Sequence, residues 1–348
     1  MTKVKEDSMA DRIKSYLKKY FIDAMGAMAL GLFASLLIGT IFNTVGKYTG
    51  LEFFAEINKM ASASSGMAIG AAIAYTLKAH PLVIFSCATV GYAGYSLGTV
   101  VNEATITAGP AGAFFAVLAA AEIGMLVSRK TKVDILVTPT VTILAGYAVA
   151  KFISPGIAYI MYYLGQFINT ATEYHPFIMG IIVSVVVGVI LTLPISSAAI
   201  CAMIAISGIA GGAAAVGCCC QMVGFAVCSF RENKWGGIVS QGLGTSMLQM
   251  ANICKNPRIW IPPTSAAAVC GPLSTLVFKL ECSGISAGMG TCGLVGPIGI
   301  IADSGTSAGT WIGILLLCVI LPGVISLAVS ELLRKIRWIR EGDMKLDN

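Results

Sequence analysis

The sequence predicts an all-α polytopic membrane protein of about ten transmembrane helices, with re-entrant or broken segments rich in Gly and Pro. Of its 348 residues, 56% are hydrophobic and 11% are charged, whereas soluble domains have about 25% charged residues. Apolar stretches long enough to span a membrane follow one another along nearly the whole chain. At ~20 residues per span, the length allows roughly ten spans and leaves no room for a separate soluble domain.

The first 20 residues are expected to form a basic amphipathic helix at the inner membrane surface. Apolar side chains recur at helical spacing, and basic side chains occupy the other side. Acidic residues near the start argue against a cleaved signal peptide. The apolar positions are Met9, Ile13, Tyr16, Leu17 and Tyr20, and the basic ones are Arg12, Lys14, Lys18 and Lys19.

Residues 21–333 are predicted to form a single transmembrane domain, and residues 334–348 a cytoplasmic basic tail. Met-Gly and Gly-Pro dipeptides recur at comparable distances, consistent with a two-fold repeat of about 21–150 and 176–333 whose halves would meet at a substrate site. The expected spans are 21–45, 60–78, 81–101, 111–128, 135–152, 154–171, 176–198 and 199–229, followed by less regular segments at 236–254, 262–280, 285–303 and 308–333.

Lys and Arg side chains cluster between these spans. Alternating the spans places every cluster on the cytoplasmic side, as the positive-inside rule requires. Both termini are therefore expected in the cytoplasm. The clusters are the N-terminus, then Arg129, Lys130 and Lys132, then Arg231 and Lys234, and finally Arg334, Lys335, Arg337 and Arg340.

Two of the later segments are poor lipid-facing helices. Segment 236–254 is short and polar, with Gln241, Ser246, Gln249 and Asn252, and segment 284–305 contains seven glycines. Backbone that is not helical must be shielded from hydrocarbon by protein or by a water-filled cavity. Both segments are therefore expected to be re-entrant hairpins or broken helices.

Ionisable groups at membrane depth are candidates for function because their burial is costly. Glu122 lies eight residues before Lys130, roughly 12 Å along a helix, and is predicted to be a buried carboxylate, either substrate-binding or a structural anchor. His80 precedes Pro81 at a junction between two apolar segments. Its imidazole either lies beside backbone groups freed by the proline or faces water in a tight turn.

The stretch 255–272, KNPRIWIPPTSAAAVCGP, concentrates prolines and cations. The prolines predict an extended chain over 256–263, with Thr264 and Ser265 capping a helix that begins near Ala266. Arg258 offers forked donors and Trp260 a flat apolar face, the pair of chemistries that sugar binding needs. The alternative is an interfacial loop with Trp260 in the aromatic belt. Asn256, Arg258, Trp260 and Thr264 join Glu122 and His80 as candidate substrate-binding residues.

Asp303 is the last candidate for substrate binding. It precedes GTSAGTWIG, whose glycines are four residues apart and allow close helix contact. Asp303 is expected either to cap that helix or to meet a ligand at its N-terminus.

Several kinds of site are absent from the sequence. It has no Cys-x-x-Cys pair, no phosphate-binding Gly-rich loop and no His-Glu-x-x-His motif. No catalytic residue, metal or cofactor is therefore predicted, and nothing supports nucleic-acid binding. Most of the eleven cysteines lie in apolar runs, where they are expected to act as small hydrophobic residues.

Five stretches together resemble the EIIC family of the bacterial phosphotransferase system, and more closely its toxin-regulator (perfringolysin-regulator-like) branch. The resemblance implies a sugar permease of about ten helices with re-entrant hairpins, usually a homodimer, in the bacterial inner membrane. It also implies EIIA and EIIB partners on separate chains if phosphate is transferred, and Glu122 and His80 as the residues that could hold sugar. The stretches are HPLVIFSCATVGYAG, GPAGAFFAVLAAAEIG, SRKTKVDILVTPTVTILAGY, NPRIWIPPTSAAAVCGP and GPIGI.

The leading hypothesis is therefore an EIIC-like permease for a small polar solute, and the family resemblance implies that this solute is a sugar. One alternative is a membrane-embedded sensor that binds a solute and signals to a cytoplasmic partner. Another is proton-coupled transport with Glu122 as the proton carrier, because burial raises a carboxyl pKa.

Overall fold

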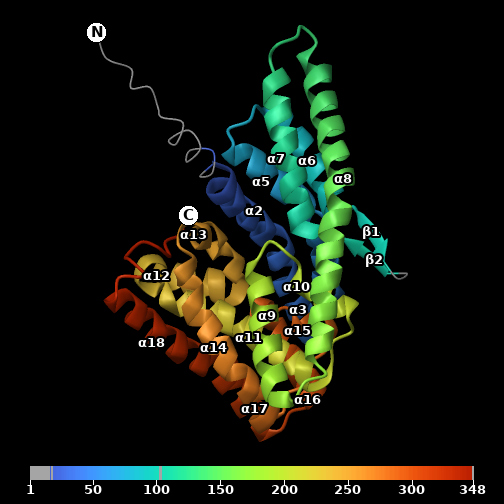
Figure 1. Ribbon diagram of the computed structural model, residues 1–348. Helices are drawn as coiled ribbons and strands as arrows, with labels where there is room; N and C mark the ends of the chain where they lie inside the picture. The colour runs from blue at the N-terminus through green and yellow to red at the C-terminus, as the bar shows by residue number, and fades with distance from the viewer. Residues whose placement is uncertain (1–15, 17–18, 102–103, 347–348) are drawn as a thin grey trace.

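The computed structural model describes residues 16, 19–101 and 104–346, and these residues are almost entirely helical. Two helical bundles are joined by the long helix α8 (Asp134–Ala171), which runs past both of them (Figure 1). Most of the amphipathic helix predicted for residues 1–20 lies outside the described residues.

The N-terminal bundle packs its helices closely because glycines face one another. A side chain at Gly66 would meet the backbone of Gly91, and one at Gly94 would meet that of Gly112. Such small residues let membrane helices approach closely. The elements are η1 (Lys19–Asp23), α2 (Ala24–Leu32), η2 (Phe33–Leu37), α3 (Ile38–Thr49), α4 (Glu52–Ala63), α5 (Ser65–Thr76), α6 (Pro81–Ser96) and α7 (Gly109–Val127).

A short antiparallel hairpin of β1 (Gly98–Val101) and β2 (Ala104–Thr107) connects α6 to α7. Gly98 pairs with Thr107 at its open end. The predicted span to residue 101 was therefore too long, since α6 ends where Leu97 becomes extended. The Thr, Val and Ile residues that follow favour strands.

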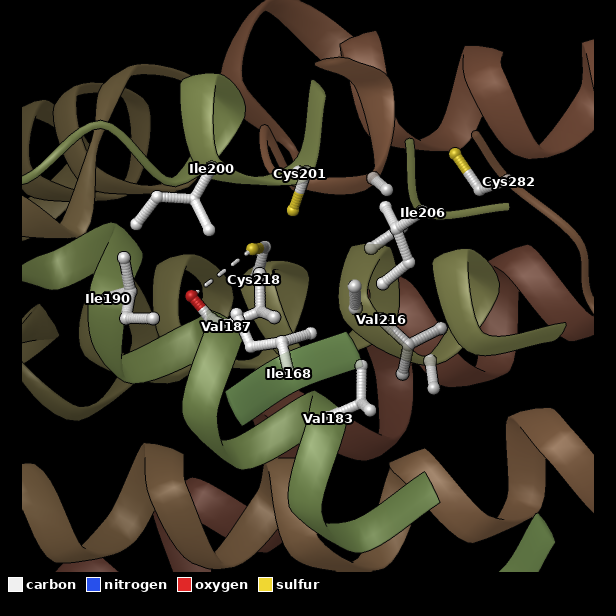
Figure 2. Close-up of a cluster of buried hydrophobic side chains, with 14 of the residues drawn as sticks. Ile168, Val183, Val187, Ile190, Ile200, Cys201, Ile206, Val216, Cys218 and Cys282 are labelled. Carbon is white, nitrogen blue, oxygen red and sulfur yellow. Dashed lines mark hydrogen bonds between the residues drawn. The ribbon is translucent and has the colours of Figure 1, made fainter. Parts of the chain in front are cut away.

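The C-terminal bundle surrounds α11 (Gly208–Cys228), which is almost wholly buried. Small residues allow this burial, and Gly217 lies directly against the backbone of Ser184. Apolar side chains around Cys218 fill the space between the helices (Figure 2). The surrounding elements are α9 (Pro176–Thr192), α14 (Ile261–Leu273), η6 (Ser274–Phe278), α17 (Ala308–Ile314), η8 (Leu315–Ile320) and α18 (Leu321–Lys335).

The single helix α8 replaces the two spans predicted at 135–152 and 154–171. Its 38 residues make it ~57 Å long, nearly twice the ~30 Å thickness of a bilayer core. Pro155 lies inside the helix without ending it. Beyond the proline, Met161 and Ile168 are buried in the C-terminal core, and this packing holds the helix together.

The chain is a polytopic membrane protein. Within the described residues, six helical segments are long and apolar enough to cross a membrane, and three shorter helices are also apolar. The expected number of about ten crossings is not confirmed and stays a prediction. The six segments are Ala24–Asn43, Gly109–Val127, Asp134–Ala171, Gly208–Cys228, Pro257–Phe278 and Ala308–Lys335.

Residues 230–255 form a re-entrant segment, here called the first hairpin, as predicted for 236–254. Arg231 at its start binds Glu331 of α18 at 2.9 Å, and Asn256 just after it donates to the Trp338 carbonyl at 3.0 Å. Both legs therefore meet the bundle at the same end, here called the basic end. Its elements are α12 (Phe230–Val239), η3 (Ser240–Gly244), η4 (Ser246–Gln249) and α13 (Met250–Lys255).

Residues 279–304 form a second hairpin, which enters from the opposite end and confirms the broken segment predicted at 284–305. Ser304 bonds to both the amide and the carbonyl of Glu281, which holds the two legs together. At the tip, Gly290 lies against the backbone of Cys218, well inside α11. The elements are α15 (Gly284–Ala287), η7 (Cys292–Leu294) and α16 (Val295–Ser304).

Helix α9 also stops inside the bundle, which corrects the spans predicted at 176–198 and 199–229. It ends at Thr192, and α10 (Ser197–Met203) leads back to the end where the second hairpin begins. There Gly208, at φ +62°, turns the chain into α11, a conformation that glycine adopts readily. The Gly208 carbonyl accepts from the amide of Cys282 at 3.2 Å.

Candidate functional site

A fully buried amide, Gln221, lies at the centre of a group of polar side chains in the C-terminal bundle. Its Nε2 donates to Thr264 Oγ1 at 3.1 Å, and its Oε1 accepts from Trp260 Nε1 at 3.1 Å. The Thr192 hydroxyl lies 3.5 Å from the same oxygen and 2.8 Å from the Ser246 hydroxyl. These five residues are here called the Gln221 cluster.

The Gln221 cluster lies at membrane depth. Gln221 precedes Cys228, the last residue of α11, by seven positions, which corresponds to ~10 Å along the helix. A buried amide is costly unless it is hydrogen-bonded, and here both its nitrogen and its oxygen have partners. Polar groups at such depth are candidates for function.

Three broken segments meet at this level. The end of α9 contributes Thr192, and the tip of the first hairpin contributes Ser246. The tip of the second hairpin lies next to them, where Thr291 Oγ1 is 3.5 Å from the sulfur of Met222. Transporters commonly build their solute sites from discontinuous segments of this kind near the bilayer midplane.

A pocket of about 370 Å³ lies against the first hairpin, which also carries Ser246 of the cluster, and its volume is within the size range of small-ligand sites. Phe33 of η2 lines the pocket and also packs against Met222. Phe33 therefore contacts both the pocket and the residue that follows Gln221 in α11. The lining comes from η1, α2, η2 and α5, from the first hairpin and from the residues after α18, and it includes Asp23, Phe33, Ser240, Leu248, Asn252 and Lys345.

Glu122 is half-buried in α7 and forms an ion pair, with its Oε1 2.6 Å from Lys19 Nζ. Burial lowers the pKa of the Lys19 ammonium, but the hydrogen bond and charge of Glu122 outweigh it and raise that pKa above its ordinary value. Glu122 is thus not the deeply buried carboxylate that the sequence predicted. The apolar residues around α7 leave the Glu122 carboxylate partly exposed, and the Lys19 side chain pairs with it there.

His80 occupies the turn between α5 and α6. Its backbone is extended, and Pro81 begins the helix at the first position, where a missing N–H does no harm. The side chain is half-buried, and within the described residues its Nδ1 is buried without a hydrogen-bond partner. The structure therefore places His80 in the expected turn, but its Nδ1 is buried and does not face water.

A comparison with known protein families identifies the family of this chain. The model of the family described as "Phosphotransferase system, EIIC" matches residues 22–346. The chain belongs to the phosphotransferase system EIIC family. No curated protein and no solved structure matches this EIIC chain.

Membership of the EIIC family makes this chain a membrane permease component of sugar transport. Glu122 and His80, the residues that the family resemblance proposed for sugar binding, lie in the N-terminal bundle. Neither is hydrogen-bonded to the Gln221 cluster among the described residues. Their role in binding a solute stays a prediction.

Trp260 and Thr264 are the predicted residues that the EIIC fold brings together. The extended chain predicted over 256–263 was wrong: η5 (Pro257–Trp260) leads directly into α14 at Ile261. Prolines fit the first turn of a helix, where their missing N–H groups need no partner. The start of α14 at Ile261 also makes the predicted capping role of Thr264 and Ser265 wrong, and it turns Thr264 toward Gln221 instead.

Asn256 and Arg258 contact the residues after α18 rather than the cluster. Asn256 Nδ2 donates to the Asp343 carboxylate at 2.7 Å, and the Arg258 guanidinium lies over the Trp338 ring at 5.0 Å. Asp303 is exposed in the last turn of α16. Its predicted capping role was wrong, because Ser307 caps α17 by accepting from the Thr310 amide.

Sequence reasoning missed the central residue Gln221, together with Thr192 and Ser246 as its partners. The available signal was the single amide within the long apolar run GAAAVGCCCQMVGF, since such a residue at membrane depth is a functional candidate. Ten of the eleven cysteines are buried. Within the described residues, no group of three or more His, Cys, Asp or Glu side chains is arranged to hold a metal.

Proposed function

We propose that this EIIC protein moves a small hydroxylated solute, a sugar, through the C-terminal bundle, and that the Gln221 cluster binds it. The observation that carries the proposal is the convergence of Trp260 and Thr264 on Gln221 beside the 370 Å³ pocket. An amide and three hydroxyls can exchange hydrogen bonds with sugar hydroxyls, because each donates and accepts. The indole ring adds an apolar face for the C–H groups.

The present arrangement corresponds to a closed site. Gln221, Thr192 and Ser246 are fully buried and bonded to one another or to their neighbours. A solute would have to replace these bonds as it enters. Movement of Phe33 and of the first hairpin would connect the pocket to the cluster, in keeping with transport by moving one unit against a fixed scaffold.

Orientation, partners and assembly complete the proposal. The basic end, with Arg231, Arg334 and Arg340, is placed in the cytoplasm by the positive-inside rule, and with it both termini. Any phosphoryl transfer would use EIIA and EIIB proteins that approach this end, and the family resemblance adds a homodimer. Proton coupling through Glu122 receives less support, because that carboxylate is half exposed and paired with Lys19.

A thermal-unfolding screen of the detergent-purified protein tests the proposal. The compounds are sugars, polyols, sugar acids, ascorbate, nucleosides and amino acids, since a ligand of the native state raises the melting temperature. We expect a shift with one class of sugars that Gln221→Leu abolishes. Gln166→Leu, on an exposed position of α8, is the matched control and should keep the shift.

Two outcomes would contradict the proposal. One is a sugar-induced shift that survives in folded Gln221→Leu protein, which would place the binding site elsewhere. The other is a screen in which none of the hydroxylated compounds shifts the melting temperature of the wild type. The second outcome would favour a regulator whose ligand is a protein or a lipid.

A further inference from the structure

The residues after α18 form a packed structure rather than a loose tail. Residues 336–346, here called the C-terminal segment, bury Ile339, Met344 and Leu346. Ile339 and Met344 belong to the same hydrophobic core as Met250 of the first hairpin. The segment is thus anchored in the interior of the protein at the basic end.

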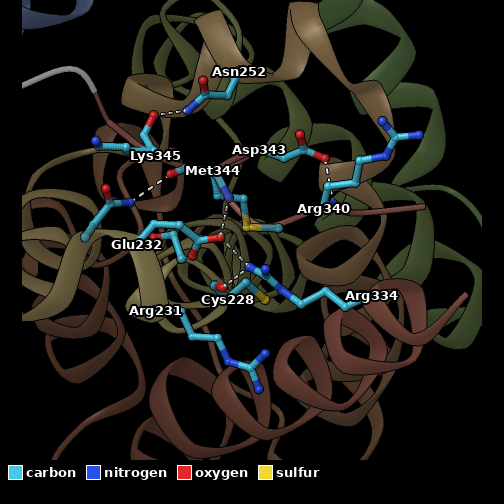
Figure 3. A network of polar contacts seen from close by, with 12 residues as sticks. Cys228, Arg231, Glu232, Asn252, Arg334, Arg340, Asp343, Met344 and Lys345 are labelled. Atoms are coloured by element: carbon cyan, nitrogen blue, oxygen red, sulfur yellow. Dashed lines mark hydrogen bonds and ion pairs between the residues drawn. The ribbon is translucent and has the colours of Figure 1, made fainter. Parts of the chain in front are cut away.

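Side-chain amides of the first hairpin bind the backbone of this segment. Asn233 Nδ2 and Gln249 Nε2 donate to the Met344 carbonyl at 2.8 and 2.9 Å, and Asn252 Nδ2 donates to the Lys345 carbonyl at 2.8 Å. Figure 3 shows Met344 and Lys345 beside Asn252 in this network. Because these hydrogen bonds go to backbone carbonyls, they depend on the backbone conformation of the segment more than on its side chains.

These bonds join the two legs of the first hairpin. Asn233 lies on α12, on the leg that enters the bundle, whereas Gln249 and Asn252 lie on the leg that returns. The Met344 carbonyl accepts from both legs. While the C-terminal segment is in place, the legs are therefore held at a fixed separation.

The same bonds continue toward the tip of the hairpin. Asn252 Nδ2 also donates to Gln249 Oε1 at 2.8 Å, and Gln249 Nε2 donates to Gln241 Oε1 at 2.8 Å. Gln241 in turn donates to Ser229 at 2.8 Å. All three amides are buried. Displacement of the C-terminal segment would therefore break hydrogen bonds that hold the hairpin that carries Ser246.

The segment also forms part of the pocket wall. Lys345 and Leu346 line it, together with Asn252 and with Asp23 of the N-terminal bundle. The lining residue Asn252 is also the residue that binds the Lys345 carbonyl. Asn252 therefore belongs both to the pocket lining and to the contacts that join the segment to the hairpin.

We propose that the C-terminal segment is a latch that holds the first hairpin closed and regulates entry to the pocket and the Gln221 cluster from the basic end. This inference rests on the proposed function only for what enters the pocket. The experiment that tests the latch needs no solute. Release of the segment would free both legs of the hairpin at once. The tip and Ser246 could then move away from Thr192.

Cysteine labelling measures directly how accessible the pocket and the hairpin tip are, and it needs no solute. Cys254 is the exposed cysteine among eleven, so Cys254→Ser provides the background. Ser240→Cys reports on the pocket, and Ser246→Cys reports on the buried tip. Each probe is treated with a small cationic methanethiosulfonate, and modification is followed by mass spectrometry of the peptide that carries it.

We expect Asn233→Ala or Asn252→Ala to speed labelling at both probes by at least about tenfold, because each variant loses more than one hydrogen bond, including one to the Met344 or the Lys345 carbonyl. Removal of residues 336–348 should speed it further. Asn169→Ala, on an exposed position of α8, is the matched control and should leave both rates unchanged. Melting temperatures measured on the same samples show whether each variant is folded.

Two results would overturn the latch. If only Ser240→Cys becomes faster, the segment is a passive cover that does not control the hairpin. If neither probe becomes faster in folded Asn252→Ala and in folded truncated protein, the segment has no part in access. Failure of the solute screen, by contrast, would refute the proposed function without changing either labelling rate.

Discussion

The indole nitrogen of Trp260 donates a hydrogen bond of 3.1 Å to the side-chain oxygen of Gln221, and it thereby ties the start of α14 to the middle of α11. Gln221 is fully buried, and Trp260 stands at the end of a proline-containing turn. The pair thus links the point where the chain re-enters the bundle to the polar cluster inside it.

Trp260→Phe tests that link by removing one donor while keeping an aromatic ring. Loss of a single buried hydrogen bond should lower the free energy of unfolding by about 1 kcal/mol, and any sugar-induced thermal shift should become smaller. Thermal unfolding with and without solute measures both effects. Trp311→Phe, at a position 53% exposed on α17, should change neither, and equal effects of the two variants would refute the assignment.

Arg334→Ala should destabilise the protein strongly. Arg334 and Glu232 are 2.8 Å apart, with side chains only 10% and 4% exposed, and removing one partner leaves a buried charge, at a cost of about 3–5 kcal/mol. Arg231→Ala breaks the exposed pair with Glu331 and should cost about 0–1 kcal/mol. If denaturant titrations gave similar losses of unfolding free energy for both variants, the larger contribution assigned to the buried pair would be wrong.

Gly217→Ala should disturb the packing of α11 against α9. An added methyl group would meet the backbone of Ser184, and such overpacking costs about 1–3 kcal/mol. Gly156→Ala on α8 has open space around the new methyl group and should be neutral or stabilising by up to about 1 kcal/mol. Melting temperatures of the two variants should therefore move in different directions.

Glu122→Gln should have a small effect at neutral pH, because the pair with Lys19 is partly exposed and such pairs contribute about 0–1 kcal/mol. Since folding raises the pKa of Lys19 above its ordinary 10.5, the pair stabilises the fold below that pH and this contribution is lost as the pH rises through the raised pKa. Melting curves of wild type and variant should converge at high pH. A gap that persists there would assign Glu122 another structural role.

Much of the fold could be read from local features of the sequence. Low charge and long apolar stretches predict a membrane protein, and the polarity of 236–254 and the glycines of 284–305 predict re-entrant segments. These signals work because lipid cannot satisfy free backbone groups. Element bounds were less predictable, since Pro155 is equally compatible with a broken helix and with a continuous one held by packing on both sides.

The functional site depended much more on tertiary structure. The chemistry of Trp260 and Thr264 was visible in the sequence, but their convergence on Gln221 arises because α14 begins at Ile261 and packs against α11. Glu122 is partly exposed and paired with Lys19, which is far away in the sequence, and no local pattern predicted that ion pair. The C-terminal segment shows the same limit. Its basic composition predicts a surface tail, whereas Met344 is buried in a hydrophobic core and its carbonyl accepts hydrogen bonds from a hairpin about 100 residues earlier.

The sequence by itself thus determined the membrane environment, the family resemblance and the two segments that do not form continuous spans, because each depends on the local balance between apolar side chains and backbone hydrogen bonds. Only the tertiary structure decided which polar residues meet, which carboxylate is paired and what covers the pocket. Those outcomes depend on contacts between residues far apart in the chain, and no local pattern encodes such contacts.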